Sequence, residues 1–314
     1  MSTHVDQDTR GAGRARRPAI EGQTGTGRSC TLGRDMLLEL HCHSTCSDGS
    51  FAPEVVASRA AQLGARVFCL TDHDSVEGCD AVTSALAGGP CQVLRGLELS
   101  CRERERTIHL LIYGLRDPAG EAALRERLVE VMRGRKARIG AIVDRLARLG
   151  IALDAETILR DSAGHTPGRP DVARALVAAR VCTSLREAFD RFLRDGGPAD
   201  VPVERVSLAD GIALGRACGA RLSLAHPHTL RSYAIVGEVF RTYRDAGLDG
   251  IEAYYGRYAT GERNSWLRMA EDLNLVVTGG SDFHGDAAPE VTRPVIDLPE
   301  RHASRLREWL DVAA

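Results

Sequence analysis

The sequence lacks the features of several protein classes. It has no apolar run long enough to cross a bilayer and no apolar leader near its start, so we expect neither a membrane span nor a signal peptide. It also lacks a charge imbalance: 41 Lys and Arg against 43 Asp and Glu give a net charge of -2. Nucleic-acid scaffolds are usually basic, so we expect no stable nucleic-acid complex.

The cysteine pattern does not predict a disulfide framework. The nine cysteines are odd in number and include no CxxC pair. A chain of 314 residues, 43% of them hydrophobic, can bury a core without disulfides. Several cysteines lie in apolar runs, such as Cys69 in VFCL, where the side chain packs as a small hydrophobe. We therefore expect reduced thiols and a cytoplasmic location.

Composition divides the chain into three parts. Residues 1–34 are rich in Gly, Thr and Arg, which predicts a disordered tail. Residues 35–117 and 204–314 alternate short apolar segments with amphipathic ones, which predicts strands, helices and a mainly parallel sheet. Residues 118–203 have apolar positions at helical spacing, which predicts a helical insertion that covers an active site.

Individual elements follow from the same patterns. Strands are predicted at an apolar run that begins at Leu37 and over 66–71, 92–99, 108–114, 221–225, 250–255 and 275–278. Helices are predicted over 53–64, 76–86, 121–150 (as one helix or two), 155–192 with a break, 208–217, 236–247, 263–273 and from Pro299 onward.

The stretch LLELHCHSTCSDG carries the first chemical signal. Residues i and i+2 of a strand share a face, so His41 and His43 project together while Cys42 points away. Asp48 follows in a turn. Two imidazoles with a nearby carboxylate resemble half of a metal site, although two surface histidines would give the same local pattern.

The pattern recurs, because most predicted strands carry His, Asp or Glu near their ends. In an α/β barrel the carboxyl ends of the strands meet at one face. The set predicted to converge is His41, His43, Asp48, His73, Glu98, His109, His226, Asp282 and His284. Nine nitrogen and oxygen donors exceed the needs of one ion, and they suit zinc, manganese or iron. Asp72 is expected to orient a ligand, and Asp74 to cap the next helix.

These segments resemble the ordered motifs of the PHP (polymerase and histidinol phosphatase) family. The motifs are HCHSTCSDGS, TDHDSVEG, GLELS, IHLLIYG, LAHP and VTGGSDFHG, between about Leu37 and Gly285. The GRP motif and REAFDRFL in the predicted insertion resemble the branch that hydrolyses nucleoside 3',5'-bisphosphates and the 5'-ends of short RNA. Histidinol phosphatases of the family usually carry His where Asp48 stands.

The resemblance implies a distorted (β/α)7 TIM-like barrel with three divalent metals, manganese first and zinc or iron as alternatives. His41, His43, Glu98 and Asp282 would hold the first metal. Glu98 would bridge to the second with His109 and His226, and Asp48, His73 and His284 would hold the third. Bound cations would neutralise phosphate oxygens and lower the pKa of a water from about 16 towards 7, giving hydroxide for attack. Asp48 or His284 would assist the leaving oxygen.

The resemblance also indicates substrate-binding residues. Arg169 in GRP resembles the phosphate-binding arginine of the family, although an arginine at a helix start is an equal alternative. The family usually continues GRPH, whereas this chain has Asp171, an anion where a phosphate would approach. His165 is a candidate substitute for that histidine, although a plain loop histidine is the simpler interpretation. His228, after the AHP motif, is a candidate to face the pocket, with a supporting or surface role as the alternative.

The leading hypothesis is a metal-dependent phosphoesterase acting on a nucleotide, a short 5'-phosphorylated RNA or another small phosphate monoester. Asp171 keeps open other hydrolases on the same metals: a cyclic phosphodiesterase, a histidinol-phosphatase-like enzyme or an amidohydrolase. A non-catalytic metal-binding module is a further alternative, but such modules lose ligands and all nine positions are filled here.

Overall fold

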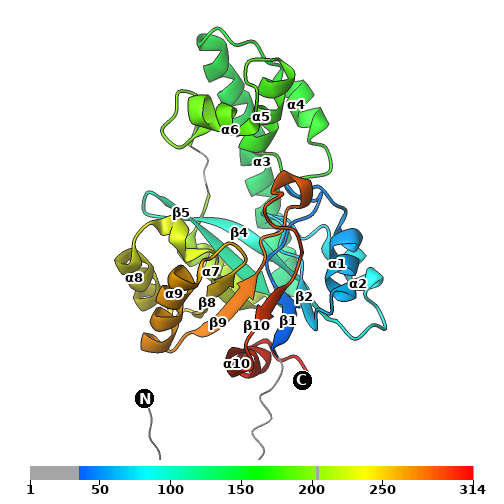
Figure 1. Ribbon diagram of the computed structural model, residues 1–314. Coiled ribbons are helices and arrows are strands. Elements are labelled where there is room, and N and C mark those ends of the chain that lie inside the picture. Colours follow the sequence, from blue (N-terminus) through cyan, green and yellow to red (C-terminus); the bar gives the residue numbers. More distant parts are fainter. Residues whose placement is uncertain (1–34, 203–204, 314) are drawn as a thin grey trace, which may run out of the picture. The chain divides into compact units, whose positions relative to one another are not determined.

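The computed structural model describes residues 35–202 and 205–313, and the tail predicted over 1–34 lies outside them (Figure 1). The described chain is a mixed α/β structure with two sheets. The predicted α/β class is therefore confirmed. No described helix is both long and apolar enough to span a bilayer.

The strands form one sheet of four and one of six. The four-stranded sheet has the order β10-β1-β2-β3, with β10 (Ile296–Leu298), β1 (Met36–Glu39), β2 (Val67–Cys69) and β3 (Gln92–Leu94). The six-stranded sheet has the order β6-β4-β5-β7-β8-β9, with β6 (Val206–Ser207), β4 (Gly96–Glu103), β5 (Arg106–Tyr113), β7 (Arg221–Leu224), β8 (Leu248–Tyr255) and β9 (Val276–Gly280).

The sheets are more mixed than predicted. Five of the eight strand pairings are parallel and three are antiparallel: β1 with β10, β4 with β5, and β5 with β7. Single bridges link the two sheets at two places, Cys42 with Phe283 and His73 with Glu98. Both bridges lie at the positions that carry the candidate metal ligands.

The strand predicted over 92–99 is two strands in different sheets. It breaks at Arg95, so that β3 pairs with β2 while β4 pairs with β5. A Cβ atom at Gly96 would lie 2.3 Å from the carbonyl oxygen of Ile112 and 2.5 Å from Sγ of Cys69. This close approach requires glycine. The short strands β6 and β10 were not predicted, since two or three residues carry no clear period.

The helices agree with their predicted positions within a few residues. They are α1 (Pro53–Gln62), α2 (Cys79–Ala85), α3 (Pro118–Arg148), α4 (Ala155–Asp161), α5 (Arg169–Ala178), α6 (Leu185–Ala188), α7 (Leu208–Ala217), α8 (Tyr233–Tyr243), α9 (Thr260–Asp272) and α10 (Glu300–Leu310). Local chemistry explains several starts: Asp117, Asp154, Ser207 and Ser232 each accept a backbone N–H of the first turn of the helix that follows.

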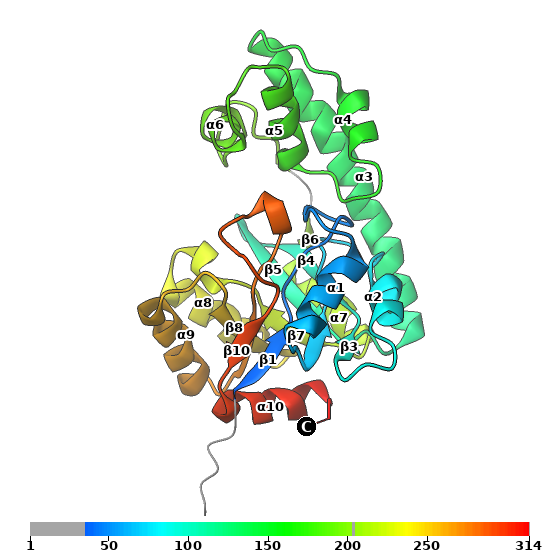
Figure 2. The ribbon, with the colours of Figure 1, turned by 45° about the vertical axis from the view of Figure 1, so that its right-hand side comes forward.

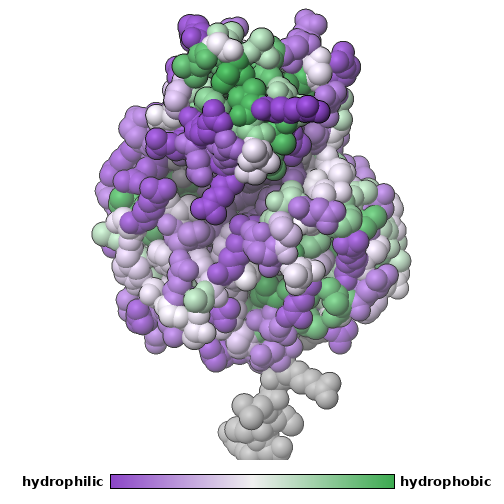
Figure 3. Space-filling model, turned by 45° about the horizontal axis from the view of Figure 1, so that its top comes forward, coloured by the Kyte–Doolittle hydropathy of each residue, from purple (hydrophilic) through white to green (hydrophobic). Residues whose placement is uncertain are grey.

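Helix α3 is one continuous helix that belongs to two cores (Figure 2). Its first half buries Leu124 and Leu128 in the main core, against the strand-bearing part. Its second half buries Ile139 and Ile142 in a separate core with α4, α5 and α6. Every regular element from Pro118 to Leu193 is helical. Figure 3 shows hydrophobic residues gathered at the top of its view within a largely hydrophilic surface.

Candidate metal centre

Glu98 lies at the centre of the candidate site. Its carboxylate is fully buried, and Oε1 lies 2.9 Å from Nδ1 of His109 and 2.9 Å from Nε2 of His226. Its Oε2 lies 2.9 Å from Nδ1 of His73 and 3.4 Å from Nε2 of both His41 and His43. Five of the predicted histidines therefore converge on one carboxylate.

Two further carboxylates complete the cluster. Oδ1 of Asp282 lies 3.2 Å from Nε2 of His43 and 3.4 Å from Nε2 of His41. Oδ1 of Asp48 lies 3.3 Å from Nε2 of His284 and 3.7 Å from Nδ1 of His43. The structure thus brings all nine predicted ligands together. Their assignment to individual metals stays a prediction.

Glu98 and His109 reach the site by a different route from the other ligands. His41, His43, His73, His226, Asp282 and His284 follow the ends of strands. Glu98 and His109 instead lie inside β4 and β5, which run antiparallel and pair Ser100 with His109. The expectation that ligands sit at carboxyl ends of parallel strands is wrong for these two. A long twisted hairpin brings them to the same place.

The buried donor atoms fit a cation. Nε2 of His41, Nε2 of His43, Nδ1 of His73 and Oε2 of Glu98 are buried without a hydrogen-bond partner. Unpaired buried polar atoms are costly, and four that converge indicate a common partner. Donors about 2.0–2.1 Å from a tetrahedral ion lie about 3.3–3.4 Å apart. The observed separations of 3.2–3.4 Å around His41 and His43 have that spacing.

Four overlapping groups of donors can each hold an ion. Within each group the donor atoms lie within 4.8 Å of one another. The groups are His43, Asp48, His73 and His284; His41, His43 and Asp282; His41, Glu98 and His226; and His73, Glu98 and His109. Each of the nine residues belongs to at least one group, so the donor set suits several divalent cations.

The protonation pattern also favours cations. Burial alone would raise the pKa of Glu98, but His73, His109 and His41 hold that pKa well below its usual range. Burial opposes charge on His41 too, yet Glu252, Glu98 and Asp282 raise its pKa well above the usual value. A proton on His41 would balance part of this negative charge whenever no metal is bound, and a divalent cation would displace it. The pKa of His43 is lowered to about 3 by burial, His284 and His73, which leaves a neutral imidazole.

Two aspartates beside the candidate ligands, Asp72 and Asp74, support the site in different ways. Asp72, expected to orient a ligand, accepts hydrogen bonds from the backbone and hydroxyl of Ser44 and from the hydroxyl of Ser47. The Ser47 hydroxyl in turn lies 3.4 Å from Nδ1 of His43, so Asp72 reaches this candidate ligand through Ser47. Asp74, however, does not cap the next helix, which begins after Gly78. It accepts from the backbone N–H of Ser100 and forms an ion pair with Arg135.

The helical part of the chain contacts the site directly. The hydroxyl of Thr166 donates to the carbonyl of His73 at 2.8 Å, and the Thr166 backbone N–H donates to the carbonyl of Cys46 at 3.2 Å. Nε of Arg135 in α3 donates to Oδ2 of Asp74 at 2.9 Å. The loop before α5 and helix α3 therefore both touch segments that carry candidate ligands.

The two predicted substrate-binding residues lie apart: Arg169 is at the start of α5, and His228 is beside the candidate metal centre. Arg169 donates to the carbonyl of Leu193 at 2.9 Å and to Asp195 at 2.7 Å. Among the described residues it makes no hydrogen bond or ion pair with the nine candidate ligands. His228 is adjacent to the site: its ring centroid lies 6.1 Å from that of His226, and its Nδ1 lies 3.0 Å from the hydroxyl of Tyr258.

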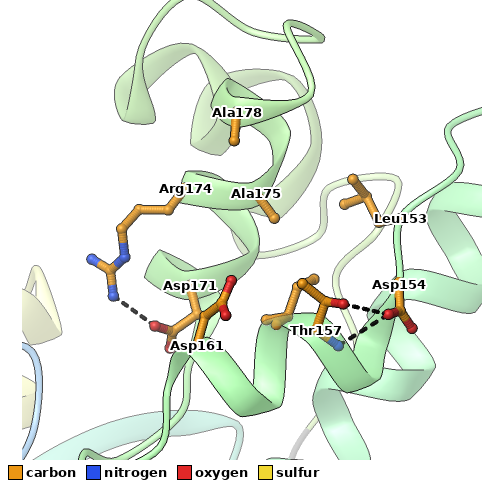
Figure 4. A pocket seen from close by; sticks show the side chains of 9 residues that line it. Leu153, Asp154, Thr157, Asp161, Asp171, Arg174, Ala175 and Ala178 are labelled. Carbon is orange, nitrogen blue, oxygen red and sulfur yellow. Dashed lines mark hydrogen bonds and ion pairs between the residues drawn. The ribbon is translucent and has the colours of Figure 1, made fainter.

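The carboxylate of Asp171 is engaged by polar groups close to it in the chain. Its Oδ1 lies 2.8 Å from Nε2 of His165 and accepts from Arg174 at 2.6 Å, and its Oδ2 accepts from the backbone N–H of Gly168. Figure 4 shows the bond to Arg174 at the edge of a cavity of about 430 Å³. That cavity lies between α4 and α5, and none of the nine candidate ligands lines it.

Comparison with known proteins agrees with this site. Residues 39–129 match the model of the PHP domain. The chain is 30% identical to a phosphoribosyl 1,2-cyclic phosphate 1,2-diphosphodiesterase of Eggerthella lenta, over 80% of this chain and 95% of the relative. It is 29% identical to a 3',5'-nucleoside bisphosphate phosphatase of Chromobacterium violaceum, over 79% of this chain and 87% of the relative.

A solved structure gives the same result at the level of the fold. A Chromobacterium violaceum protein described as an amidohydrolase, with bound sulfate and no metal, superposes with a TM-score of 0.77. It is 29% identical, and the match covers 87% of this chain and 95% of that one. Sequence, fold and clustered ligands agree: the chain belongs to the PHP family of metal-dependent phosphoesterases and is a hydrolase of phosphate esters.

Proposed function

We propose that this enzyme hydrolyses a phosphate monoester of a nucleotide, of the nucleoside 3',5'-bisphosphate kind, or of a similar small molecule. The observation that carries the proposal is the difference in burial among the nine converging donors. The side chains of His41, His43 and Glu98 are fully buried, whereas those of Asp48 and His109 are 27% and 24% exposed. A phosphate would approach from the exposed side.

We propose three divalent cations, manganese first and zinc or iron as alternatives. Their ligands would be His41, His43, Glu98 and Asp282 for the first, Glu98, His109 and His226 for the second, and Asp48, His73 and His284 for the third. When bound, such cations would neutralise phosphate oxygens and acidify a water. Asp48 and His284, whose side chains remain partly exposed, would assist the leaving oxygen.

A group of four arginines supports a substrate with a second phosphate. Arg138 and Arg169 lie 3.3 and 4.0 Å from the same oxygen of Asp200. Burial, together with the nearby charges of Arg169 and Arg205, lowers the pKa of Arg138 to about 10. In the part of the chain that the structure describes, this group with Arg135 carries one positive charge more than the carboxylates of Asp74, Asp195 and Asp200 in contact with it or close by. Arginine suits a phosphate that is recognised but not cleaved.

We propose that residues 118–203 act as an insertion that caps the active site. The contacts of Thr166 with His73 and Cys46, and of Arg135 with Asp74, support this role. Asp171 does not oppose an anionic substrate under this proposal, because Arg174 balances its charge and His165 contacts the same oxygen. Its departure from the family pattern then maintains the loop rather than changing the reaction.

We further propose that the two sheets are arcs of a distorted (β/α)7 barrel over residues 35–117 and 204–314. The bridges between Cys42 and Phe283 and between His73 and Glu98 support this, since they would join β9 to β1 and β2 to β4 and complete a ring of seven strands. A cytoplasmic location stays a prediction. The eight cysteines that the structure describes are free thiols, which suits a reducing compartment.

A cyclic phosphodiesterase is the second candidate. The relative from Eggerthella lenta is named for that activity and is as similar to this chain as the bisphosphate phosphatase. Hydrolysis of a cyclic diester would use the same clustered donors. The two candidates differ in whether the first bond broken belongs to a monoester or a diester.

Phosphate release from a substrate panel, with metal content measured on the same sample, tests the proposal. The panel contains nucleoside 3',5'-bisphosphates, mononucleotides, cyclic phosphates, histidinol phosphate and short 5'-phosphorylated RNA, each with manganese. We expect selective turnover of the bisphosphate and its loss in His43→Ala. Turnover of the cyclic phosphate alone would favour the second candidate. No turnover by fully loaded protein would contradict both and favour the amidohydrolase alternative.

A further inference from the structure

Glu252 is a buried carboxylate that touches two candidate ligands without belonging to any of the four donor groups. It lies in β8, and its side chain is fully buried. Its Oε1 lies 2.8 Å from Nδ1 of His41. Its Oε2 accepts the backbone N–H of His226 at 2.7 Å. Both oxygens are therefore engaged by residues of the candidate metal centre.

We infer that Glu252 is a positioning residue, which selects the tautomer of His41 and holds the backbone of His226 so that both can ligate metal. The inference rests on the proposed metal centre. An imidazole that donates Nδ1–H to a carboxylate presents the lone pair of Nε2 on the opposite side of the ring. Nε2 of His41 is the buried, unpaired atom that lies 3.4 Å from carboxylate oxygens of both Glu98 and Asp282.

The second contact acts on backbone geometry. His226 has φ 24° and ψ 66°, a conformation that non-glycine residues rarely adopt. Such strain persists only where surrounding contacts impose it. The bond from its N–H to Glu252 is one such contact, and Nε2 of His226 then lies 2.9 Å from Glu98. One carboxylate thus controls the side-chain orientation of one ligand and the main chain of another.

Glu39 provides a contrast within the same site. It is also fully buried, and its Oε1 accepts the backbone N–H groups of His41 and Ser281, each at 2.9 Å. These hydrogen bonds come from main-chain N–H groups, whereas Glu252 contacts an imidazole directly. Glu39 therefore supports the chain path, whereas Glu252 contacts Nδ1 of His41 and can favour the proton on that nitrogen.

The substitution Glu252→Gln tests the inference by changing one oxygen to an amide. Gln has one acceptor, so if it keeps the bond from His226 its NH₂ group faces Nδ1 of His41. That arrangement favours the proton on Nε2, the nitrogen needed for the metal. We expect manganese affinity, measured by equilibrium dialysis with metal analysis, to fall about 10- to 100-fold, as for other groups that orient a metal-bound histidine.

Asp249→Asn is the matched control on the same strand. Asp249 accepts from Nε1 of Trp309 at 3.1 Å, at a position apart from the candidate ligands. It should bind manganese as the wild type does. A folded Glu252→Gln protein with affinity within about twofold of wild type would overturn the inference while leaving the proposed function intact. A wild-type protein that binds no divalent metal would overturn both.

A second measurement needs no variant and decides the matter if Glu252→Gln fails to fold. In zinc-loaded wild-type protein, nitrogen-15 NMR of the histidine rings should show His41 protonated at Nδ1 and zinc-bound through Nε2. The opposite assignment, with the proton on Nε2, would overturn the inference directly. Neither measurement depends on turnover, so a wrong substrate would not affect the answer.

Discussion

Replacing Arg135 with methionine removes the side chain that ties helix α3 to the loop after His73. Nε of Arg135 donates to Oδ2 of Asp74 at 2.9 Å, and its other nitrogens donate to Oγ of Ser100 at 3.1 Å and to the carbonyl of Pro167 at 3.5 Å. Methionine retains most of the side-chain volume but donates no hydrogen bond. Asp74, whose side chain is 1% exposed, would be left without its charged partner.

The expected loss is large because the remaining charge stays buried. Removing one partner of a buried ion pair costs about 3–5 kcal/mol. The Arg135 side chain is 18% exposed, and Asp74 keeps its bond from the Ser100 N–H, so we expect the lower end, about 3 kcal/mol. The total stability of a folded protein is only about 5–15 kcal/mol, so this change is readily measured.

Urea unfolding followed by circular dichroism gives the free energy of unfolding for each variant. The control is Arg127→Met in the same helix, whose pair with Glu130 is 38% and 55% exposed and should contribute about 0.3–0.5 kcal/mol. A cycle with Asp74→Asn should give a coupling of at least about 1 kcal/mol. A loss below about 1 kcal/mol for Arg135→Met, or a coupling near zero, would refute the reasoning.

Three further predictions concern the site and its surroundings. Gly280→Ala should prevent metal binding or folding, because the added Cβ would lie 2.3 Å from Cβ of His41. Gly140→Ala, with no atom within 4 Å of the added Cβ, should instead stabilise the folded protein by up to about 1 kcal/mol. Urea titration and metal analysis check both variants. Removal of metal by a chelator should lower the melting temperature in calorimetry, since a ligand at 100 times its Kd stabilises the folded protein by about 2.7 kcal/mol. Equal melting temperatures with and without chelator would count against a metal centre in the folded state. Burial alone would lower the pKa of His73, but Glu98 and Asp48 raise it to about 9 in the metal-free protein. Metal binding at pH 8 should therefore release protons that an indicator dye detects. The stability that this group gives the metal-free fold should be lost as pH rises from 6.5 to 9. Metal binding without proton release would contradict the charge balance described for the site.

The amino-acid sequence alone was enough to predict the donor set and most of the elements around it. His41 and His43 were recognisable because their spacing puts both on one face of an extended segment, and the other ligands because polar residues of one chemical kind recur beside apolar runs. Hydrophobic periodicity located the helices within a few residues. Such local signals survive in a single sequence because neighbours in the chain produce them.

The isolated charged residues that support the site could be recognised only in the folded structure. Glu252, Arg135 and Glu39 are single charged residues inside a strand or a helix, and each has a partner far away in the sequence. Glu252 contacts His41 across 211 positions, Arg135 contacts Asp74 across 61, and Glu39 contacts Ser281 across 242. The break at Arg95 likewise depends on the close approach of Gly96 to Ile112 and Cys69. Such contacts arise from packing between elements, and no period or spacing along the chain encodes them.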